Sequence, residues 1–380
     1  MKVEPPVPAA VLDAIRAPFA AMGAESIDPP VLQPLGLILD LSGEAMRERL
    51  IVAQADAGGE AALRPDFTIA AARLHIASGR AGGRYFYEGK AFRAAPRGLG
   101  ACEEFLQIGL EAFEARDVAE ADAEIAALAW RAAAAAGRSD LTLHLGDVGL
   151  FAALIDSLGL AAPLAARLKR GFSSPSRLHA LLAGPADRPA LEGEAAGERL
   201  AQLLAGLPEA AATAVLEDIW ALAGIEPVGG RSAAEIVHRL ASRSAGEAAP
   251  GLDPGDAELI RRFLAISDAP AAALEAVARL ARTGGEILEA ALNRWSRRLA
   301  ALKAHGAPEA AMRLATAFGS DFGYYDGMLF EIRSAALGEL APVAAGGRYD
   351  GLPARLGARS DCGAVGCMVR PGRAWAGGAP

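Results

Sequence analysis

Cysteine is scarce in this chain, with three among 380 residues. An odd number of thiols cannot pair completely within one chain, and no two of them have the spacing of a metal knuckle or a redox motif. We therefore interpret Cys102, Cys362 and Cys367 as buried or incidental thiols. The histidines are also not spaced as a metal-binding pair on one helix, so we predict no metal site and no cofactor.

Basic runs and long apolar runs are also missing. The formal net charge is −8 and Lys and Arg never form a long cluster, which weighs against a nucleic-acid partner. The apolar stretches are interrupted by charge or glycine before they reach the roughly 20 residues that span a bilayer. The N-terminus lacks the features of a secretory signal. We therefore expect a cytoplasmic protein with no membrane partner.

Local patterns predict helices and strands in the first third of the chain. Residues 8–22 form an amphipathic pattern closed by Gly23, which is typical of a helix. The apolar run 35–43 favours a buried strand. Thr68 is placed to be the N-cap of a helix that begins at Ile69.

Two further helix boundaries follow from the same reasoning. Residues 117–137 have a helical pattern, and Gly137 is suited to the left-handed position that follows a helix. The segment LTLHLGDVGLF predicts a short strand followed by a helix. Asp147, in the turn between them, is more typical of a helix cap than of a catalytic acid paired with His144.

The middle of the chain differs from its two ends. Residues 151–310 are mainly Ala- and Leu-rich helix, and strand patterns return in 324–335, 341–352 and 361–373. We expect an α+β fold in which residues 1–150 and 311–380 build one mostly antiparallel sheet. Residues 151–310 would be a helical insertion.

One face of the predicted sheet carries small and polar residues. Because strand side chains alternate, residues 106–112 place an apolar row on one side of their strand, and the other side carries Gln107, Gly109 and Glu111. Gly109 leaves a gap between the two polar residues, which we interpret as the floor of a site for a small polar ligand. The alternative is a sheet face that is simply exposed to water.

Neighbouring segments repeat this arrangement. The preceding strand aligns Tyr85, Tyr87, Gly89, Ala91 and Arg93 on one face. The guanidinium of Arg93 is a planar donor suited to a carboxylate or a phosphate. The segments RPDFT and AAGGRYDG add further polar residues after small ones: Asp66, Thr68, Arg348, Tyr349 and Asp350. Three segments with one pattern favour a pocket over a wet surface.

At these residues the sequence resembles the catalytic domain of the class II histidyl-tRNA synthetases. The matching segments, in the family's order, are LRPDFT, YEGKAFR with FLQIGLEAF, YYDGMLFE, AGGRYDGL and AVGCMVRPGR. The resemblance covers most of the chain outside the helical middle. It implies a class II aminoacyl-tRNA synthetase-like antiparallel sheet flanked by helices, and a homodimer built partly on the N-terminal helix and strand.

The resemblance also implies a pocket that binds histidine. The histidine-binding residues that the resemblance implies are Asp66, Thr68, Arg93, Gln107, Glu111, Tyr324, Tyr325 and Tyr349. Asp66 is one methylene shorter than the glutamate of the family.

The positions that handle ATP depart from the family's pattern. Ala95 replaces a glutamate that reads adenine, and Glu103 replaces an arginine, which reverses a charge that faces the phosphates. Ser320 falls where the family has its histidine-specific arginine. Arg373 matches the arginine of the last motif, although Arg370 and Pro371 differ from it. We expect no anticodon-binding domain and no tRNA partner.

A histidine pocket without the means to charge tRNA is similar to the synthetase-like regulatory subunits of ATP phosphoribosyltransferase. The resemblance implies that the chain is not itself an enzyme. It implies a hetero-oligomer with a short-form catalytic subunit of that phosphoribosyltransferase, in which histidine is the feedback effector at the first step of histidine biosynthesis.

Two other hypotheses remain open on the sequence. The chain could be a stand-alone, degenerate histidyl-tRNA synthetase, against which Ala95, Glu103 and Ser320 argue. It could also be a synthetase-like enzyme that activates another amino acid or modifies a protein. Pyrophosphate exchange into ATP, measured with a panel of amino acids, distinguishes both from a regulatory subunit.

Overall fold

The computed structural model describes most of the chain: residues 3–54, 59–95, 102–183, 203–204, 207–223, 233–234, 237, 252–280, 285–319, 322–338, 341–358 and 362–377. The chain has two compact units. The first comprises Met1–Ser157 and Arg262–Pro380, and the second comprises Leu158–Arg261. Within the predicted insertion of 151–310, the helices that follow Arg262 therefore belong to the first unit.

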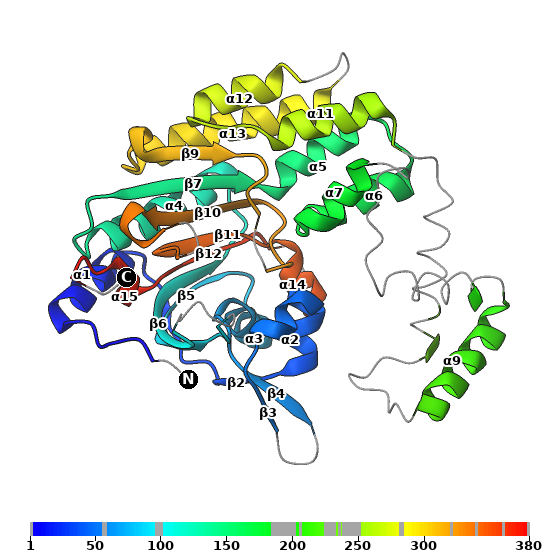
Figure 1. The fold of residues 1–380 in the computed structure, drawn as a ribbon. Helices are drawn as coiled ribbons and strands as arrows, with labels where there is room; N and C mark the ends of the chain where they lie inside the picture. Colours follow the sequence, from blue (N-terminus) through cyan, green and yellow to red (C-terminus); the bar gives the residue numbers. More distant parts are fainter. Residues whose placement is uncertain are drawn as a thin grey trace. The chain divides into compact units, whose positions relative to one another are not determined.

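A nine-stranded sheet, in the order β1-β5-β6-β12-β11-β10-β7-β9-β8, forms the centre of the first unit (Figure 1). Its six middle strands are antiparallel, while β1 pairs with β5 and β7 with β9 in parallel. The strands are β1 (Glu25–Ser26), β5 (Gly83–Phe92), β6 (Glu104–Phe113), β7 (Leu141–Asp147), β8 (Ser267–Asp268), β9 (Met312–Ala315), β10 (Met328–Ser334), β11 (Ala344–Arg348) and β12 (Ala364–Val369). The predicted α+β fold with a mostly antiparallel sheet is confirmed.

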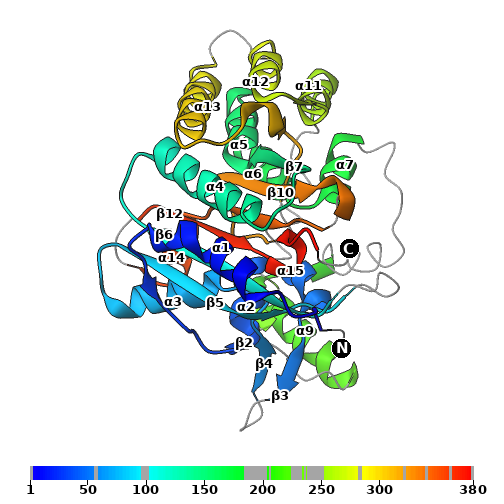
Figure 2. The ribbon, with the colours of Figure 1, turned by 90° about the vertical axis from the view of Figure 1, so that its left-hand side faces the viewer.

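Helices α1 (Ala9–Ala20) and α4 (Val118–Ala134) lie side by side over one face of this sheet (Figure 2). Both helices were predicted at these positions, and Gly23 and Gly137 have the expected positive φ angles of +63° and +96°. The long helix α13 (Glu286–Ala304) packs on α4 and on α5 (Val148–Ser157). The alanine-rich face of α4 permits this close packing because its side chains are short.

The prediction of a buried strand at 35–43 is wrong. Residues Leu35–Ser42 form helix α2, which ends at Gly43 with a φ of +94°. A short apolar run that is buried on most sides does not distinguish a strand from a helix. Beside α2 lies a separate three-stranded sheet of β2 (Leu32–Pro34), β4 (Glu60–Leu63) and β3 (Val52–Gln54).

The predicted N-cap role of Thr68 is also wrong. Thr68 is the first residue of α3 (Thr68–Ser78), and its backbone N–H donates to the Asp66 carboxylate at 3.1 Å. The Asp66 carboxylate instead accepts the hydrogen bond at the N-terminus of this helix. The Thr68 hydroxyl is therefore available to another partner. The cap predicted at Asp147 is confirmed, because its Oδ1 accepts from the N–H of Gly149 at 2.7 Å and of Leu150 at 3.3 Å.

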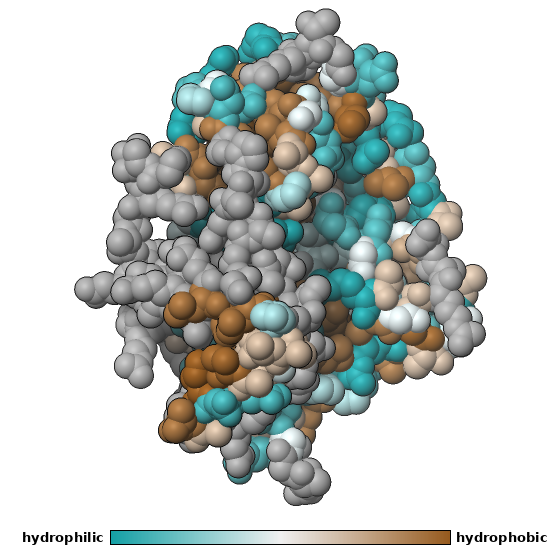
Figure 3. Space-filling view, turned by 90° about the vertical axis from the view of Figure 1, so that its right-hand side faces the viewer, coloured by the Kyte–Doolittle hydropathy of each residue, from teal (hydrophilic) through white to brown (hydrophobic). Residues whose placement is uncertain are grey.

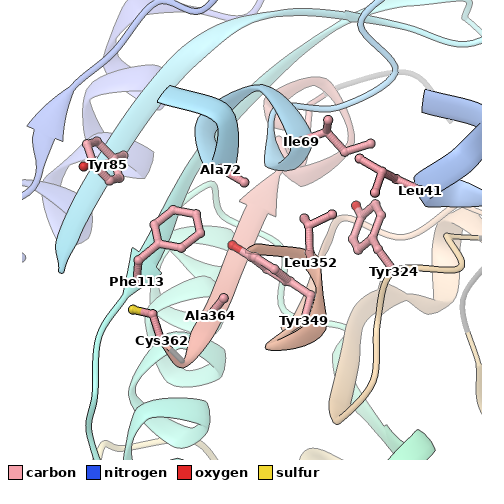
Figure 4. Packing of buried hydrophobic residues seen from close by; sticks show 10 residues of the cluster. All are labelled: Leu41, Ile69, Ala72, Tyr85, Phe113, Tyr324, Tyr349, Leu352, Cys362 and Ala364. Carbon is pink, nitrogen blue, oxygen red and sulfur yellow. The ribbon is translucent and has the colours of Figure 1, made fainter. Parts of the chain in front are cut away.

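Helix α3 and the short helix α14 (Gly351–Arg355) lie on the second face of the sheet and enclose a small core with strands β5, β6 and β12. Figure 4 shows two of its aromatic members pointing toward each other, Phe113 from the end of β6 and Tyr349 from the residue after β11. The hydroxyl groups of Tyr324 and Tyr349 stand at the border of this core. The polar side chains described below begin there.

The second unit is helical where it is described. Its helices include α6 (Ala162–Gly171), α7 (Pro175–Ala183) and α9 (Glu209–Ala223), and α11 (Pro254–Leu264) crosses its boundary. One side of α9 is buried through Ala212 and Leu216. Val215, Ile219 and Leu222 of the same helix are exposed. Figure 3 shows brown, apolar atoms and teal, hydrophilic atoms side by side on the face that it presents.

Cys102, Cys362 and Cys367 are all free thiols, and the last two are buried. Among the described helices, none has both the length and the apolarity needed to cross a bilayer. The remaining short helices of the first unit are α12 (Pro270–Ala278) and α15 (Pro371–Ala374).

Candidate functional site

The β5–β6 ribbon forms one wall of the candidate site. Its register places Tyr85 opposite Glu111, Tyr87 opposite Gly109, and Gly89 opposite Gln107. The two polar rows predicted from period two therefore face the same side of the sheet, below α3.

Gly109 does not leave an empty floor. A Cβ atom at this position would lie 2.3 Å from the hydroxyl oxygen of Tyr87, so the phenol of Tyr87 occupies the predicted gap. The Tyr87 ring also stacks on Phe67, with centroids 4.2 Å apart and planes 5° from parallel. Gly109 is needed for this side-chain packing, and Tyr87 joins the site as a residue that the sequence alone did not select.

Glu111 is the centre of the hydrogen-bond network. Its carboxylate accepts from the Thr68 hydroxyl at 2.8 Å, from the Tyr87 hydroxyl at 3.4 Å, and from the Tyr349 hydroxyl. The side chain is 1% exposed, and this burial raises the pKa of Glu111 to about 8, because a charged carboxylate is poorly solvated there. Three hydroxyl donors offset part of that cost.

Asp66 is a second buried carboxylate on the same side. It accepts from the backbone N–H of Thr68 and, through Oδ2, from the hydroxyl of Tyr324 at 3.1 Å. Burial raises the pKa of Asp66, and the positive charge of Arg93 opposes this shift. In the described part of the chain, neither Asp66 nor Glu111 forms an ion pair within hydrogen-bonding distance.

Three tyrosines form an aromatic wall above the two carboxylates. The ring of Tyr324 lies 4.7 Å from that of Tyr325 and 6.0 Å from that of Tyr349. The Tyr325 and Tyr349 centroids are 6.2 Å apart. Aromatic side walls with a few polar groups are typical of small-molecule pockets.

Arg93 lies just after β5, at the edge of this group. Its Nε donates to the carbonyl of Pro65 at 2.9 Å, and its guanidinium lies over the rings of Phe322 and Phe105 at 4.9 and 5.4 Å. Burial lowers the pKa of Arg93, and the charge of Asp66 opposes this. The positive charge of Arg93 therefore acts on Asp66, although no hydrogen bond between the two side chains is present among the described residues.

Gln107 shares the face of Glu111 but is separated from the network. It is fully buried, and neither the oxygen nor the nitrogen of its side-chain amide has a hydrogen-bond partner in the described structure. A buried amide without partners is costly and points to a missing ligand or water. The structure thus brings Asp66, Thr68, Glu111 and the three tyrosines into contact, with Arg93 and Gln107 at the margin.

The grouping of Arg348 with Tyr349 among the polar residues of the predicted pocket is wrong, because Arg348 points to the other face of the sheet. Its guanidinium forms ion pairs with Asp122 of α4 at 2.6 Å and with Asp350 at 2.7 Å. Asp122 also pairs with Arg298 of α13 at 2.6 Å. Successive residues of an extended segment face opposite sides, so Arg348 supports the helical layer while Tyr349 faces the network around Glu111.

The altered ATP positions are neighbours at the end of the β5–β6 ribbon. The N–H of Arg93 donates to the carbonyl of Glu103 at 2.9 Å, and the N–H of Ala95 lies 3.5 Å from the Glu103 carboxylate. A negative charge therefore stands where the synthetase pattern has a positive one. Ser320 lies outside the described residues.

The fold defines a class II synthetase-like protein. A solved structure from Bacillus halodurans, described as an ATP phosphoribosyltransferase regulatory subunit/histidyl-tRNA synthetase, aligns with a TM-score of 0.62 and 22% identity over 95% of this chain and 76% of that one. Histidyl-tRNA synthetase from Nostoc aligns with a TM-score of 0.60 and 15% identity over 96% of this chain and 69% of that one. At these identities the similarity concerns the fold alone.

Sequence comparisons are more specific. Residues 9–224 and 211–371 match the family model of histidyl-tRNA synthetase. ATP phosphoribosyltransferase regulatory subunits from Mesorhizobium japonicum and Agrobacterium fabrum are 37% and 34% identical to this chain, covering 92% of it and 92% and 91% of their own lengths. The chain therefore belongs to the histidyl-tRNA synthetase family, within its branch of ATP phosphoribosyltransferase regulatory subunits.

Proposed function

We propose that this chain binds histidine in the pocket around Glu111 and transmits feedback inhibition to a short-form catalytic subunit, which it also activates. The observation that carries the proposal is the pair of buried carboxylates, Asp66 and Glu111, that lack a cationic partner. A buried negative charge without a partner is unfavourable, and a ligand with a positive charge relieves it.

Histidine offers the matching groups. Its ammonium group and its imidazole N–H can each donate a hydrogen bond to one of the two carboxylates. The three tyrosine rings suit the flat imidazole ring. The ligand carboxylate would face Arg93, whose positive charge acts on Asp66. Bound histidine would also favour the ionised form of Glu111, whose pKa burial raises to about 8.

The proposed partners follow from the names of the relatives and from this site. We propose a homodimer of this chain within a hetero-oligomer with the catalytic subunit, in the cytoplasm and without tRNA. The chain would catalyse no reaction itself, and the charge reversal at Glu103 supports this. Histidine can regulate the complex only if it binds one arrangement of the subunits more tightly than another.

Glu111→Gln tests the sensor. Removing the charge is expected to weaken histidine binding by about 1.5–3 kcal/mol, which is roughly 10- to 150-fold in Kd by calorimetry. Phosphoribosyl transfer by the reconstituted complex is expected to continue, with weaker inhibition by histidine. Glu104→Gln is the matched control, because Glu104 lies on the same strand but pairs with the exposed Lys90 at 2.6 Å.

Two results would contradict the proposal. Unchanged histidine affinity in Glu111→Gln would place the effector site elsewhere. Histidine-dependent exchange of labelled pyrophosphate into ATP by the purified chain would instead support the synthetase-like alternative.

A further inference from the structure

Arg64 is a buried arginine that follows β4 and stands two residues before Asp66. It is 3% exposed, and burial lowers its pKa. Among the described residues, its one ion pair is with Asp28 at 3.6 Å, and the side chain of Asp28 is 89% exposed. An exposed carboxylate is a weak counter-ion, so the other contacts of the guanidinium must offset the cost of burying its charge.

Backbone carbonyl groups hold this guanidinium. Its Nε donates to the carbonyl of Lys90 at 2.8 Å, and its Nη1 donates to the carbonyl of Pro29 at 2.5 Å. The main chain of Arg64 adds two bonds, since its N–H donates to Val31 at 2.8 Å and its carbonyl accepts from the N–H of Phe92 at 3.0 Å. Arg64 therefore fastens the chain that leads into the site to β5 and to the segment before β2.

The flat side of the guanidinium covers an aromatic pair. Its central carbon lies 4.0 Å from the centroid of the Phe67 ring, which stacks on Tyr87 at 4.2 Å. Two groups so close to one centroid cannot share a face of the ring, so Phe67 lies between Arg64 and Tyr87. A Cβ at Gly89 would be 2.7 Å from Arg64 Nη2 and 2.9 Å from Phe67 Cζ, so glycine leaves the space for this stack. The hydroxyl of Tyr87 then donates to Glu111 at 3.4 Å.

Asp66 lies between the two held residues of this segment. Arg64 is fixed on one side of it by backbone bonds, and Phe67 is fixed on the other side by the stack. The carboxylate of Asp66 accepts from the N–H of Thr68 and from the hydroxyl of Tyr324, both at 3.1 Å. A side chain whose backbone is held on both sides is already ordered before a ligand arrives, which lowers the entropy cost of binding.

We propose that Arg64 is a positioning residue of the histidine site, which holds Asp66 and Tyr87 in the geometry that receives the positive groups of the ligand. Arg64 acts through these two residues and not by its own contact with the ligand. Lysine cannot replace it, because a single ammonium group has neither the planar face nor the fixed fork of donors. This inference rests on the proposed function for its ligand, but its structural part can be measured without one.

Arg64→Lys tests the role in the full chain. It is expected to weaken histidine binding by at least about tenfold in calorimetry, because Asp66 and Tyr87 are no longer held in place. Without histidine, hydrogen exchange at the Thr68 amide, which donates to Asp66, is expected to accelerate by at least about tenfold relative to the amides of β12.

Phe67→Leu is a second variant, which removes the stack and leaves the arginine in place. It is expected to change both measurements in the same direction, by roughly threefold or more. Arg298→Lys is the matched control, because Arg298 is 2% exposed and lies over the ring of Trp295 at 4.5 Å on the helical face of the sheet. It is expected to lower stability while leaving histidine affinity and the relative exchange of Thr68 unchanged.

The results separate this inference from the proposed function. If Glu111→Gln weakens histidine binding and Arg64→Lys does not, the positioning role is overturned and the proposed function stands. It is also overturned if Arg64→Lys and Arg298→Lys give the same relative exchange at Thr68. If wild type does not bind histidine, the proposed function fails, and exchange at Thr68 alone decides whether Arg64 positions Asp66.

Discussion

Gly366 of β12 leaves the space in which the Glu111 carboxylate lies. A Cβ at Gly366 would be 1.6 Å from Glu111 Oε2, and the carboxylate cannot move freely because three hydroxyl groups hold it. A tight glycine contact of this kind makes the position specific for glycine on steric grounds.

We predict that Gly366→Ala lowers the free energy of unfolding by about 1–3 kcal/mol, because the added methyl group overpacks the site. Histidine binding is expected to weaken in the same variant, since Glu111 must shift. Urea denaturation and calorimetry measure the two effects. Gly36→Ala in α2, where a Cβ would meet nothing within 4 Å, is the control and should be neutral or slightly stabilising.

At this scale the sequence predicted which strand residues share a face, but not which side chains touch one another. Period two was enough to place Gln107 and Glu111 on one face. Arg348 was wrongly grouped with Tyr349, because the alternation was not applied within that segment and Arg348 faces Asp122 on the other side. Period two could not show that the Tyr87 phenol fills the gap at Gly109, because that depends on the register between β5 and β6.

Helix α4 illustrates how one element serves both its own stability and the sheet. Its N-cap, Asp117, accepts from the N–H of Ala119 and Glu120. In its second turn, Asp122 is fully buried between Arg298 of α13 and Arg348 of β11. Asp122 therefore joins two helices and a strand.

Asp122→Ala is expected to destabilise the first unit by about 3–5 kcal/mol, because it removes the carboxylate that two buried arginines share and leaves each with one weaker or more exposed partner, Asp147 or Asp350. Asp117→Ala on the same helix should cost only about 1 kcal/mol, since it removes a cap and an exposed ion pair with Arg297. Chemical denaturation of both variants makes the comparison. Equal losses would show that the buried network contributes no more than the cap.

Elements with a clear period were predicted, and those without one were not. Helices α1 and α4 have a regular apolar stripe and a terminal glycine, so their limits followed from the sequence. Residues 35–42 are apolar on most sides, and only their packing beside β4 selects the helix. The short strands β8 and β9 were missed because two to four residues within helical surroundings have no measurable alternation.

The whole molecule combines a sheet-based unit with an inserted helical one, which have separate cores. The described core of the inserted unit contains Leu204, Ala212, Leu216, Ala233 and Val237. Since none of these residues belongs to the sheet of the first unit, damage to this core should remain local.

Leu216→Ala is expected to lower the stability of the inserted unit by about 2–5 kcal/mol, because Leu216 is 4% exposed. Hydrogen exchange within Leu158–Arg261 should then accelerate, while the amides of β5 and β6 keep their protection. Leu222→Ala on the same helix removes a side chain that is 90% exposed and should change stability by less than about 0.5 kcal/mol. Faster exchange throughout the sheet would contradict this independence.

Arg348 and Tyr349 are consecutive in the chain, and their side chains point to opposite faces of the sheet. Tyr349 binds the pocket carboxylate, whereas Arg348 lines a cleft of about 390 Å³ on the other side, together with Arg294 and Arg297 of α13. One peptide bond therefore joins the hydrogen-bond network around Glu111 to the ion pairs on the helical face of the sheet. A change in backbone position at either residue must be accommodated by contacts on both faces.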